Sequence, residues 1–189
     1  MIFNEHYNLE GCHAILSPSN HYWLRYKDKA RFSQLLKSRE AIKRGVEDHE
    51  FACTCIQRKQ KLPKSKQTLN AYVNDAIGYH MEPEKILYYS EYCFGTADAI
   101  VFNERQKKLR IHDLKTGVTK ASMDQLLLYA GLFCLEYKKK PSEITVELRI
   151  YQSNEVVVHN PEPDELMAII DQIILANKNI TELKQEEPK

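Results

Sequence analysis

Two aspartates and a lysine, Asp98, Asp113 and Lys115, have the types and spacing that could support hydrolytic chemistry. Carboxylate oxygens are hard ligands that suit Mg²⁺ or Mn²⁺, and a magnesium site usually takes only one or two carboxylates from the protein. An ammonium group beside them could orient an attacking water, accept its proton or stabilise charge on a phosphate. The three residues are therefore a minimal set for metal-assisted phosphodiester hydrolysis. The structural alternative is an exposed Asp/Lys pair at a strand end.

Two apolar runs rich in strand formers, 94–102 and 109–114, carry both aspartates and are separated by a polar stretch. This pattern predicts a β-hairpin. Pairing of its strands would bring Asp98 close to Asp113. Lys115 follows Asp113 by two positions, so it should point to the same side of the strand.

The rest of the chain shows helical and strand periodicities in alternating blocks. We expect helices near residues 19–26, 31–44, 46–60, 67–79, 120–138 and from 161–165 to 176 or beyond. We expect strands near residues 86–93, 96–103, 108–114, 144–151 and 155–159.

The length of 189 residues and the 43% hydrophobic content are sufficient for one buried core, so we expect a single domain over residues 1–189. Within it we expect a helical, basic N-terminal part (1–80), a catalytic α/β core (81–160) and a C-terminal helix (161–183). The sequence has no apolar run near about eighteen residues and no signal-peptide pattern. We therefore expect an intracellular, cytoplasmic protein without membrane association.

The formal net charge of +1 conceals a basic segment. Residues 25–66 hold thirteen Lys/Arg and five Asp/Glu, and Trp23, Tyr26 and Phe32 lie in or beside this segment. Such a face could neutralise phosphates and stack on a frayed base, whereas a solvated helical surface is the alternative. We expect DNA as the partner and binding that weakens steeply with salt.

Five short motifs occur in a fixed order between about residues 13 and 152. They are residues 13–19 with Trp23, Gly45-x-x-x-His49, Gly95-x-x-Asp98, Asp113-Leu114-Lys115-Thr116-Gly117 and Gln125-x-x-x-Tyr129. Together they resemble the RecB-like branch of the PD-(D/E)XK nuclease superfamily, and more closely its small phage and prophage members. The chain departs from that pattern in having Ala97 in place of the family's proline and a short interval between Lys115 and Gln125.

The resemblance implies an α/β fold with a restriction-endonuclease-like core, in which helices flank a central mixed β-sheet and the N-terminal region is helical. It also implies which residues form the site. The metal would be held by His49, Asp98, Asp113 and the backbone carbonyl of Leu114. Lys115 would be the catalytic lysine, and Gln125 and Tyr129 would line the site from one helix face, as their spacing of four allows.

Two of these assignments have structural alternatives, and a further residue, Glu91, has two possible roles. Tyr129 lies in an apolar stretch and could pack in the core, and His49 could be a structural or solvated histidine. An imidazole beside carboxylates fits Mn²⁺ better than Mg²⁺. Glu91, on the strand expected before Asp98, could add a carboxylate or simply be polar strand surface.

The five cysteines are scattered and form no C-x-x-C pair, so we expect reduced thiols. Some relatives, including CRISPR-associated exonucleases, hold an iron-sulfur cluster through one upstream cysteine and three near the C-terminus. No cysteine follows Cys134, and Tyr26 stands where such relatives often have one. We expect no iron-sulfur cluster.

The function that these features predict is a Mg²⁺- or Mn²⁺-dependent DNA nuclease, with an exonuclease acting on double- or single-stranded DNA ends favoured. The expected setting is phage or mobile-element recombination, repair or DNA processing, in the host cytoplasm if phage-encoded. A recombination or annealing protein is a possible partner by family analogy, and an oligomer is possible. The alternatives are a structure-specific endonuclease and a non-catalytic DNA-binding or partner-binding module.

Overall fold

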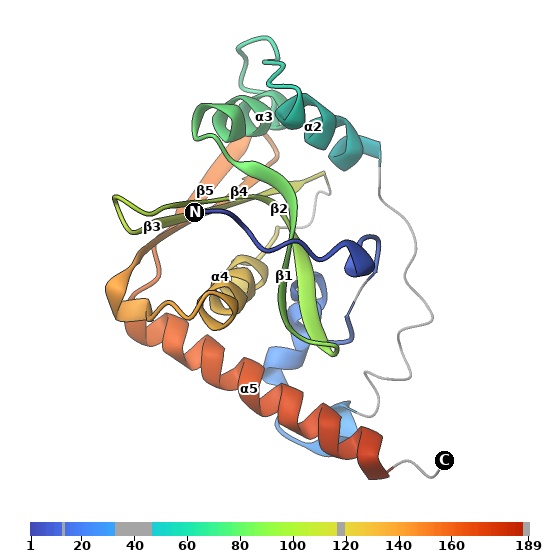
Figure 1. Ribbon diagram of the computed structural model, residues 1–189. Helices are drawn as coiled ribbons and strands as arrows, with labels where there is room; N and C mark the ends of the chain where they lie inside the picture. Colours follow the sequence, from blue (N-terminus) through green and yellow to red (C-terminus); the bar gives the residue numbers. More distant parts are fainter. Residues whose placement is uncertain (13, 33–46, 117–119, 187–189) are drawn as a thin grey trace.

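A five-stranded mixed sheet forms the centre of the molecule in a computed structural model, which describes residues 1–12, 14–32, 47–116 and 120–186 (Figure 1). The strands follow the order β1-β2-β3-β4-β5. Their bounds are β1 Glu82–Ser90, β2 Cys93–Asn103, β3 Lys108–Lys115, β4 Thr145–Gln152 and β5 Glu155–His159. All neighbouring pairs are antiparallel except β3 and β4, which are parallel.

Helices cover both faces of this sheet (Figure 1). One face carries α2 (Glu47–Gln57) and α3 (Thr68–Gly78), and the other carries α4 (Asp124–Glu136) and α5 (Pro163–Glu186). The parallel pairing of β3 with β4 requires a crossover connection, and α4 supplies it. The coarse expectation of an α/β fold with a mixed sheet flanked by helices is confirmed.

Strand alternation divides the apolar side chains between two cores. Along β2, Ala99 and Val101 pack in the cluster beneath α2 and α3, whereas Ile100 and Phe102 pack in the larger cluster beneath α4. This is the period of two that a strand buried on both faces requires. In β3, Ile111 belongs to the cluster beneath α4, so Asp113, two residues later, lies on the α4 side. Leu114 belongs to the cluster beneath α2 and α3.

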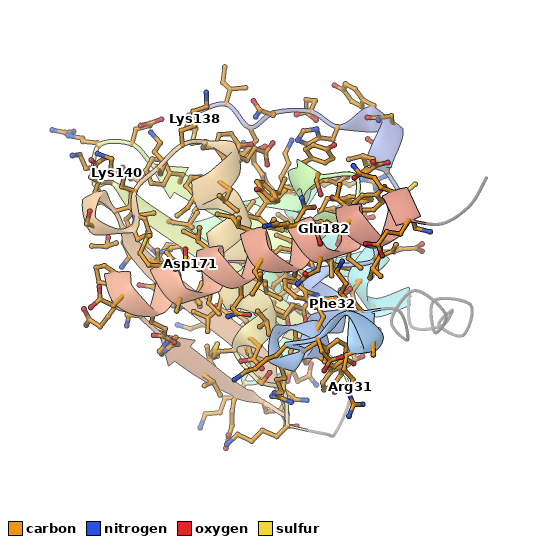
Figure 2. The ribbon with its side chains drawn as sticks, turned by 90° about the horizontal axis from the view of Figure 1, so that it is seen from below. Arg31, Phe32, Lys138, Lys140, Asp171 and Glu182 are labelled. Atoms are coloured by element: carbon orange, nitrogen blue, oxygen red, sulfur yellow. The ribbon has the colours of Figure 1, made fainter. Side chains whose placement is uncertain are left out.

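Helix α4 is buried on nearly every side because it lies between the sheet and α5. Gly131 allows the close approach of the two helices, since a Cβ there would lie 2.9 Å from Ile173 Cδ1. Figure 2 shows α5 crossing this face, with Asp171 and Glu182 along it and Phe32 on the neighbouring segment. Lys29 Nζ lies 3.0 Å from Glu182 Oε2, so an ion pair also joins the N-terminal part of the chain to α5.

Short 3₁₀-helices complete the described chain at Tyr7–Leu9, Pro18–Arg25 and Pro141–Glu143. The second of these occupies most of the helix expected at 19–26. Residues 29–32 are helical, and the rest of the helix expected at 31–44 lies outside the described residues. Among the described residues, no helix combines the length and apolar character needed to cross a membrane.

Most other expected elements are present, and the largest error concerns the first strand. The strand expected at 86–93 begins at Glu82 and ends at Ser90, and residues 91–92 form the turn into β2. Pro83 and its polar neighbours favour a turn rather than a strand in the sequence pattern. In the structure, Pro83 pairs with Ala99 of β2.

Candidate functional site

The two aspartates lie side by side on adjacent strands. Ala99 pairs with His112 in the antiparallel β2–β3 ladder, so Asp98 and Asp113 come next in register. The Leu114 N–H donates a hydrogen bond to Asp98 Oδ2 at 2.9 Å. Because the N–H and C=O of one strand residue point toward the same neighbouring strand, the Leu114 carbonyl also faces β2. The predicted hairpin is confirmed, with Asp98 beside Asp113.

Lys115 lies between a strand carboxylate and a helix amide. Its Nζ is 3.0 Å from both Asp113 oxygens and 2.7 Å from Gln125 Oε1. Gln125 is in the first turn of α4, so the crossover helix fixes the position of the ammonium group. The structure thus brings together Asp98, Asp113, Lys115 and Gln125, as the sequence analysis expected.

Asp113 is buried and Asp98 is partly buried, and both have little compensating charge. Burial raises the pKa of Asp98 to about 7, although the Leu114 N–H hydrogen bond acts in the opposite direction. Burial, and then the negative charge of Asp98, raise the pKa of Asp113 to about 7 despite the Lys115 ammonium group. Within the described residues, Asp113 Oδ2 accepts no hydrogen bond of good geometry. A cation bound here would relieve the repulsion between the carboxylates.

His49 and a glutamate not singled out by the sequence analysis complete the cluster. His49 Nδ1, in the first turn of α2, lies 3.4 Å from Asp98 Oδ2. Burial lowers the pKa of His49, which favours the neutral imidazole that binds metals. One ligand atom each from His49, Glu84 and Asp98 lie within 4.8 Å of one another. These three could share one ion, with Asp113 next to it.

Glu84 reaches this position through an unusual backbone conformation. Its φ of 50° is left-handed although it lies inside strand β1, opposite Asp98. Such a conformation costs a non-glycine residue roughly 1–2 kcal/mol, and strain of this kind is concentrated at functional sites. The Glu84 side chain is accessible to solvent, yet the protein atoms around its carboxylate desolvate it enough to raise its pKa to about 7.

Of the two roles considered for Glu91, the structure favours a polar surface residue, although in a turn and not on a strand. Glu91 is exposed in the turn between β1 and β2, and Ser90 pairs with Cys93 at the same end of the hairpin. Asp98 lies five residues further along β2. The sequence did not indicate Glu84, because the segment that contains Pro83 shows no alternation of apolar and polar residues typical of a strand. No sequence signal marks a glutamate with a left-handed backbone within a strand.

Tyr129 is buried in the core cluster beneath α4 and donates its hydroxyl hydrogen to the carbonyl of Thr96. The core-packing alternative therefore describes most of this side chain. Its hydroxyl nonetheless fixes the backbone two residues before Asp98. Tyr129 is a positioning residue in this arrangement and does not contact Lys115 as Gln125 does.

The N-terminal motif supports the strand that carries Asp98. Pro18 packs against Gly95 so closely that a Cβ on the glycine would lie 2.5 Å from Pro18 Cδ. Trp23 is buried, and its Nε1 donates a hydrogen bond to the Ser17 carbonyl at 3.4 Å. His13 lies outside the described residues. The motif therefore acts as a packed support for β2.

The basic segment divides into parts with different surroundings. Trp23 and Phe32 are each 1% exposed, so the expectation that they stack on a frayed base is wrong. They belong to the core because the 3₁₀-helix and the following turn pack against α4 and α5. Residues 33–46 lie outside the described residues. Five basic residues that follow α2 or approach α3 are exposed, namely Arg58, Lys59, Lys61, Lys64 and Lys66.

Comparisons with known proteins leave the family open. No family model matches the sequence, and no curated protein matches it. Among solved structures, the chain is similar to the crystal structure of SSO0001, with 13% identity and a TM-score of 0.33. That match covers 85% of this chain and 72% of the other.

Proposed function

We propose that this protein is a Mg²⁺- or Mn²⁺-dependent deoxyribonuclease, with an exonuclease acting on DNA ends favoured. The observation that carries the proposal is the pair of aspartates, the buried Asp113 and the partly buried Asp98, beside the ammonium group of Lys115. Both carboxyl groups have pKa values raised to about 7, and among the described residues Asp113 Oδ2 has an ion-pair contact with Lys115 but no hydrogen bond of good geometry. The order of motifs and their resemblance to RecB-like nucleases point to the same chemistry.

The residues present fit a divalent cation. Asp98, Asp113, Glu84, His49 and the Leu114 carbonyl would hold it, and their oxygen-rich composition with one imidazole suits Mn²⁺ or Mg²⁺. When bound, the ion would polarise the scissile phosphate and lower the pKa of a water. Without an ion, three carboxylates face a single ammonium group, so phosphate would be repelled from the site.

Lys115 has the geometry of a preorganised donor. Asp113 and Gln125 hold its Nζ at 3.0 and 2.7 Å, which leaves little freedom for the ammonium group to move. In that position it can orient an attacking water or donate a hydrogen bond to a phosphate oxygen as negative charge develops. Gln125 keeps the ammonium group in place when Asp113 contacts the cation.

DNA is the proposed substrate because exposed cations lie close in sequence to the site helices. Arg58 and four lysines between it and α3 form a stretch without an acidic residue from 51 to 74. Each contact of such a residue with a phosphate releases counterions, so binding should weaken steeply as salt rises. Nearly salt-independent binding would contradict this part of the proposal.

The decisive experiment is digestion of linear duplex DNA labelled at either end, with Mg²⁺, Mn²⁺ or EDTA. Lys115→Ala should abolish metal-dependent release of label. Lys178→Ala is the matched control, because this exposed lysine lies on α5 and should leave activity unchanged. Activity that survives Lys115→Ala, or that does not require a metal, would refute the proposed mechanism.

Covalently closed DNA separates the alternatives. An exonuclease should leave it intact, whereas a structure-specific endonuclease would cut a closed circle that contains a cruciform or bubble. Absence of activity on duplex, single-stranded and branched DNA would favour a binding module. Repeating the assay with a recombination or annealing protein tests whether the nuclease needs such a partner.

A further inference from the structure

A cavity of about 230 Å³ opens directly beside Lys115. The described residues that line it include Leu114, Lys115 and Thr116 at the end of β3. Its other walls are the start of α3, the first turn of α2 and the turn between β4 and β5. The cavity therefore adjoins the candidate catalytic site at Leu114 and Lys115. Its walls at the start of α3 and at the β4–β5 turn belong to elements that the proposed mechanism does not use.

The outer wall of this cavity is preformed. The Thr68 N–H donates to Asn154 Oδ1 at 3.1 Å, and the Asn154 N–H donates to Thr68 Oγ1 at 2.7 Å. This reciprocal pair joins the N-terminus of α3 to the β4–β5 turn, where Ser153 has a φ of 52°. A wall fixed in advance loses little conformational entropy when a ligand enters.

The chemistry of the walls matches a nucleoside. Leu69 offers an apolar surface on which the face of a base can lie, and Asp48 offers carboxylate oxygens that can accept hydrogen bonds from base or sugar. Lys115 stands at the boundary with the aspartates, where the phosphate of the same nucleotide would lie.

We infer that the cavity takes the base and sugar of one unpaired nucleotide next to the scissile phosphate. This inference rests on the proposed nuclease function and extends it to the form of the substrate. A volume of about 230 Å³ admits one nucleoside and is too small for a base pair. The strand being cut is therefore single-stranded at the site, and a duplex end must fray before it is cleaved.

The test combines a substrate change with a change in the cavity wall. Single-stranded DNA carrying one abasic residue, moved stepwise along the strand, is digested by the wild type, by Leu69→Trp and by the matched control Leu69→Met. For the wild type, cleavage should fall about tenfold when the abasic residue occupies one fixed position relative to the cut, since a stacked base contributes about 1–3 kcal/mol. Leu69→Trp fills the cavity, so intact DNA should be cut about tenfold more slowly. The abasic residue should then have no further effect.

Each outcome decides a different point. If the effects of Leu69→Trp and the abasic residue multiply, or if the abasic residue has no effect at any position, the inference is overturned while the nuclease stands. If the wild type cleaves no substrate with either metal, the proposed function itself fails and the inference fails with it. A terminal mismatch should also speed cleavage of a duplex by the wild type but not by Leu69→Trp.

A second variant guards against misfolding of Leu69→Trp, which would be visible as loss of a cooperative thermal transition. Ser153→Asn lengthens a side chain in the opposite wall, and asparagine tolerates the positive φ at that position. It should reduce cleavage of intact DNA less than Leu69→Trp does, and it should weaken the effect of the same abasic position. An unchanged abasic effect in this variant would overturn the inference.

Discussion

Two groups of charged residues in the same sheet, one around Glu147 and one around Asp98 and Asp113, have opposite electrostatic surroundings. On the α3 side, Glu147 is contacted by three cations, with Lys108 Nζ at 2.6 Å, Arg110 Nε at 3.1 Å and Arg149 Nη2 at 3.0 Å. Burial would raise its pKa, but these partners lower it to about 2. At the other group, Asp98, Asp113 and Glu84 share one nearby ammonium group and have pKa values of about 7.

The difference shows that this chain can surround a buried carboxylate with cationic partners, as it does at Glu147. Arg149 also contacts Asp75 and Tyr79, so the Glu147 group is a closed network of protein partners. Among the described residues, the aspartates have one ammonium partner, Lys115, and one backbone donor, Leu114, so their charge is only partly neutralised. This is the arrangement expected when an external cation completes the site. Variants that change one group and leave the other intact test this difference.

The largest expected effect is on catalysis. Asp113→Asn and Asp98→Asn should each lower DNA cleavage by on the order of 10³-fold, because each removes a negative charge from the cation site and alters the setting of Lys115. Glu147→Gln should change cleavage less than about threefold when assayed below its unfolding temperature. Initial rates of release from end-labelled DNA measure all three. Similar losses for all three would remove the distinction between the groups.

The next effect is the response of stability to metal and pH. Because the pKa values of Asp98 and Asp113 are raised, the native protein binds more protons than the unfolded chain between about pH 4 and pH 7. Their contribution to the free energy of unfolding therefore falls as pH rises through that window. A divalent cation should offset this loss and raise Tm by roughly 5–10 °C at pH 8 when saturating.

The metal effect should be smaller at pH 6, where protons compete for the carboxylates. Differential scanning fluorimetry with Mn²⁺ and with EDTA at both pH values gives the comparison. Asp113→Asn should lose most of the shift, and Glu147→Gln should keep it. A shift that is the same at pH 6 and pH 8 would argue against carboxylates with raised pKa values as the ligands.

A smaller effect, on the free energy of unfolding of the metal-free protein, has opposite signs in the two groups. Without metal at pH 8, Asp113→Asn should raise the free energy of unfolding by about 1–2 kcal/mol, since it removes a charge that burial disfavours. Glu147→Gln should lower it by roughly 1–2 kcal/mol, because it leaves partly solvated cations without their shared carboxylate. Urea denaturation with EDTA present tests the signs, and two changes of the same sign would refute the contrast.

The smallest predicted effect concerns the backbone of Glu84. Glu84→Gly should raise the stability of the metal-free protein by about 0.5–1 kcal/mol, because glycine adopts a left-handed φ without strain and so offsets its entropic disadvantage. Glu84→Gln retains the strain and should not show this gain when the two variants are compared at about pH 5, where the Glu84 carboxyl is protonated. Both variants should bind Mn²⁺ more weakly than the wild type, as measured by isothermal titration calorimetry. Unchanged Mn²⁺ affinity in both would remove Glu84 from the cation site.

The sequence predicted the features that depend on local pattern. The β2–β3 hairpin, strand β5 and the helix carrying Gln125 all have strong periods or clear turns, so Asp98, Asp113, Lys115 and Gln125 could be placed together. Glu84 could not, because Pro83 hides the strand period and its left-handed φ depends on the finished sheet. The burial of Trp23 and Phe32 likewise depends on α5, which lies far along the chain.

The packing of α4 has a consequence for the order in which the protein is made. Its apolar surface is continuous, and the side facing away from the sheet is covered by α5, more than 25 residues later in the chain. During synthesis from the N-terminus, the sheet and α4 emerge from the ribosome before their cover does. Nascent chains that stop before α5 should therefore expose the apolar surface of α4 and recruit chaperones. The synthesis of α5 covers this surface and so lowers the tendency to aggregate.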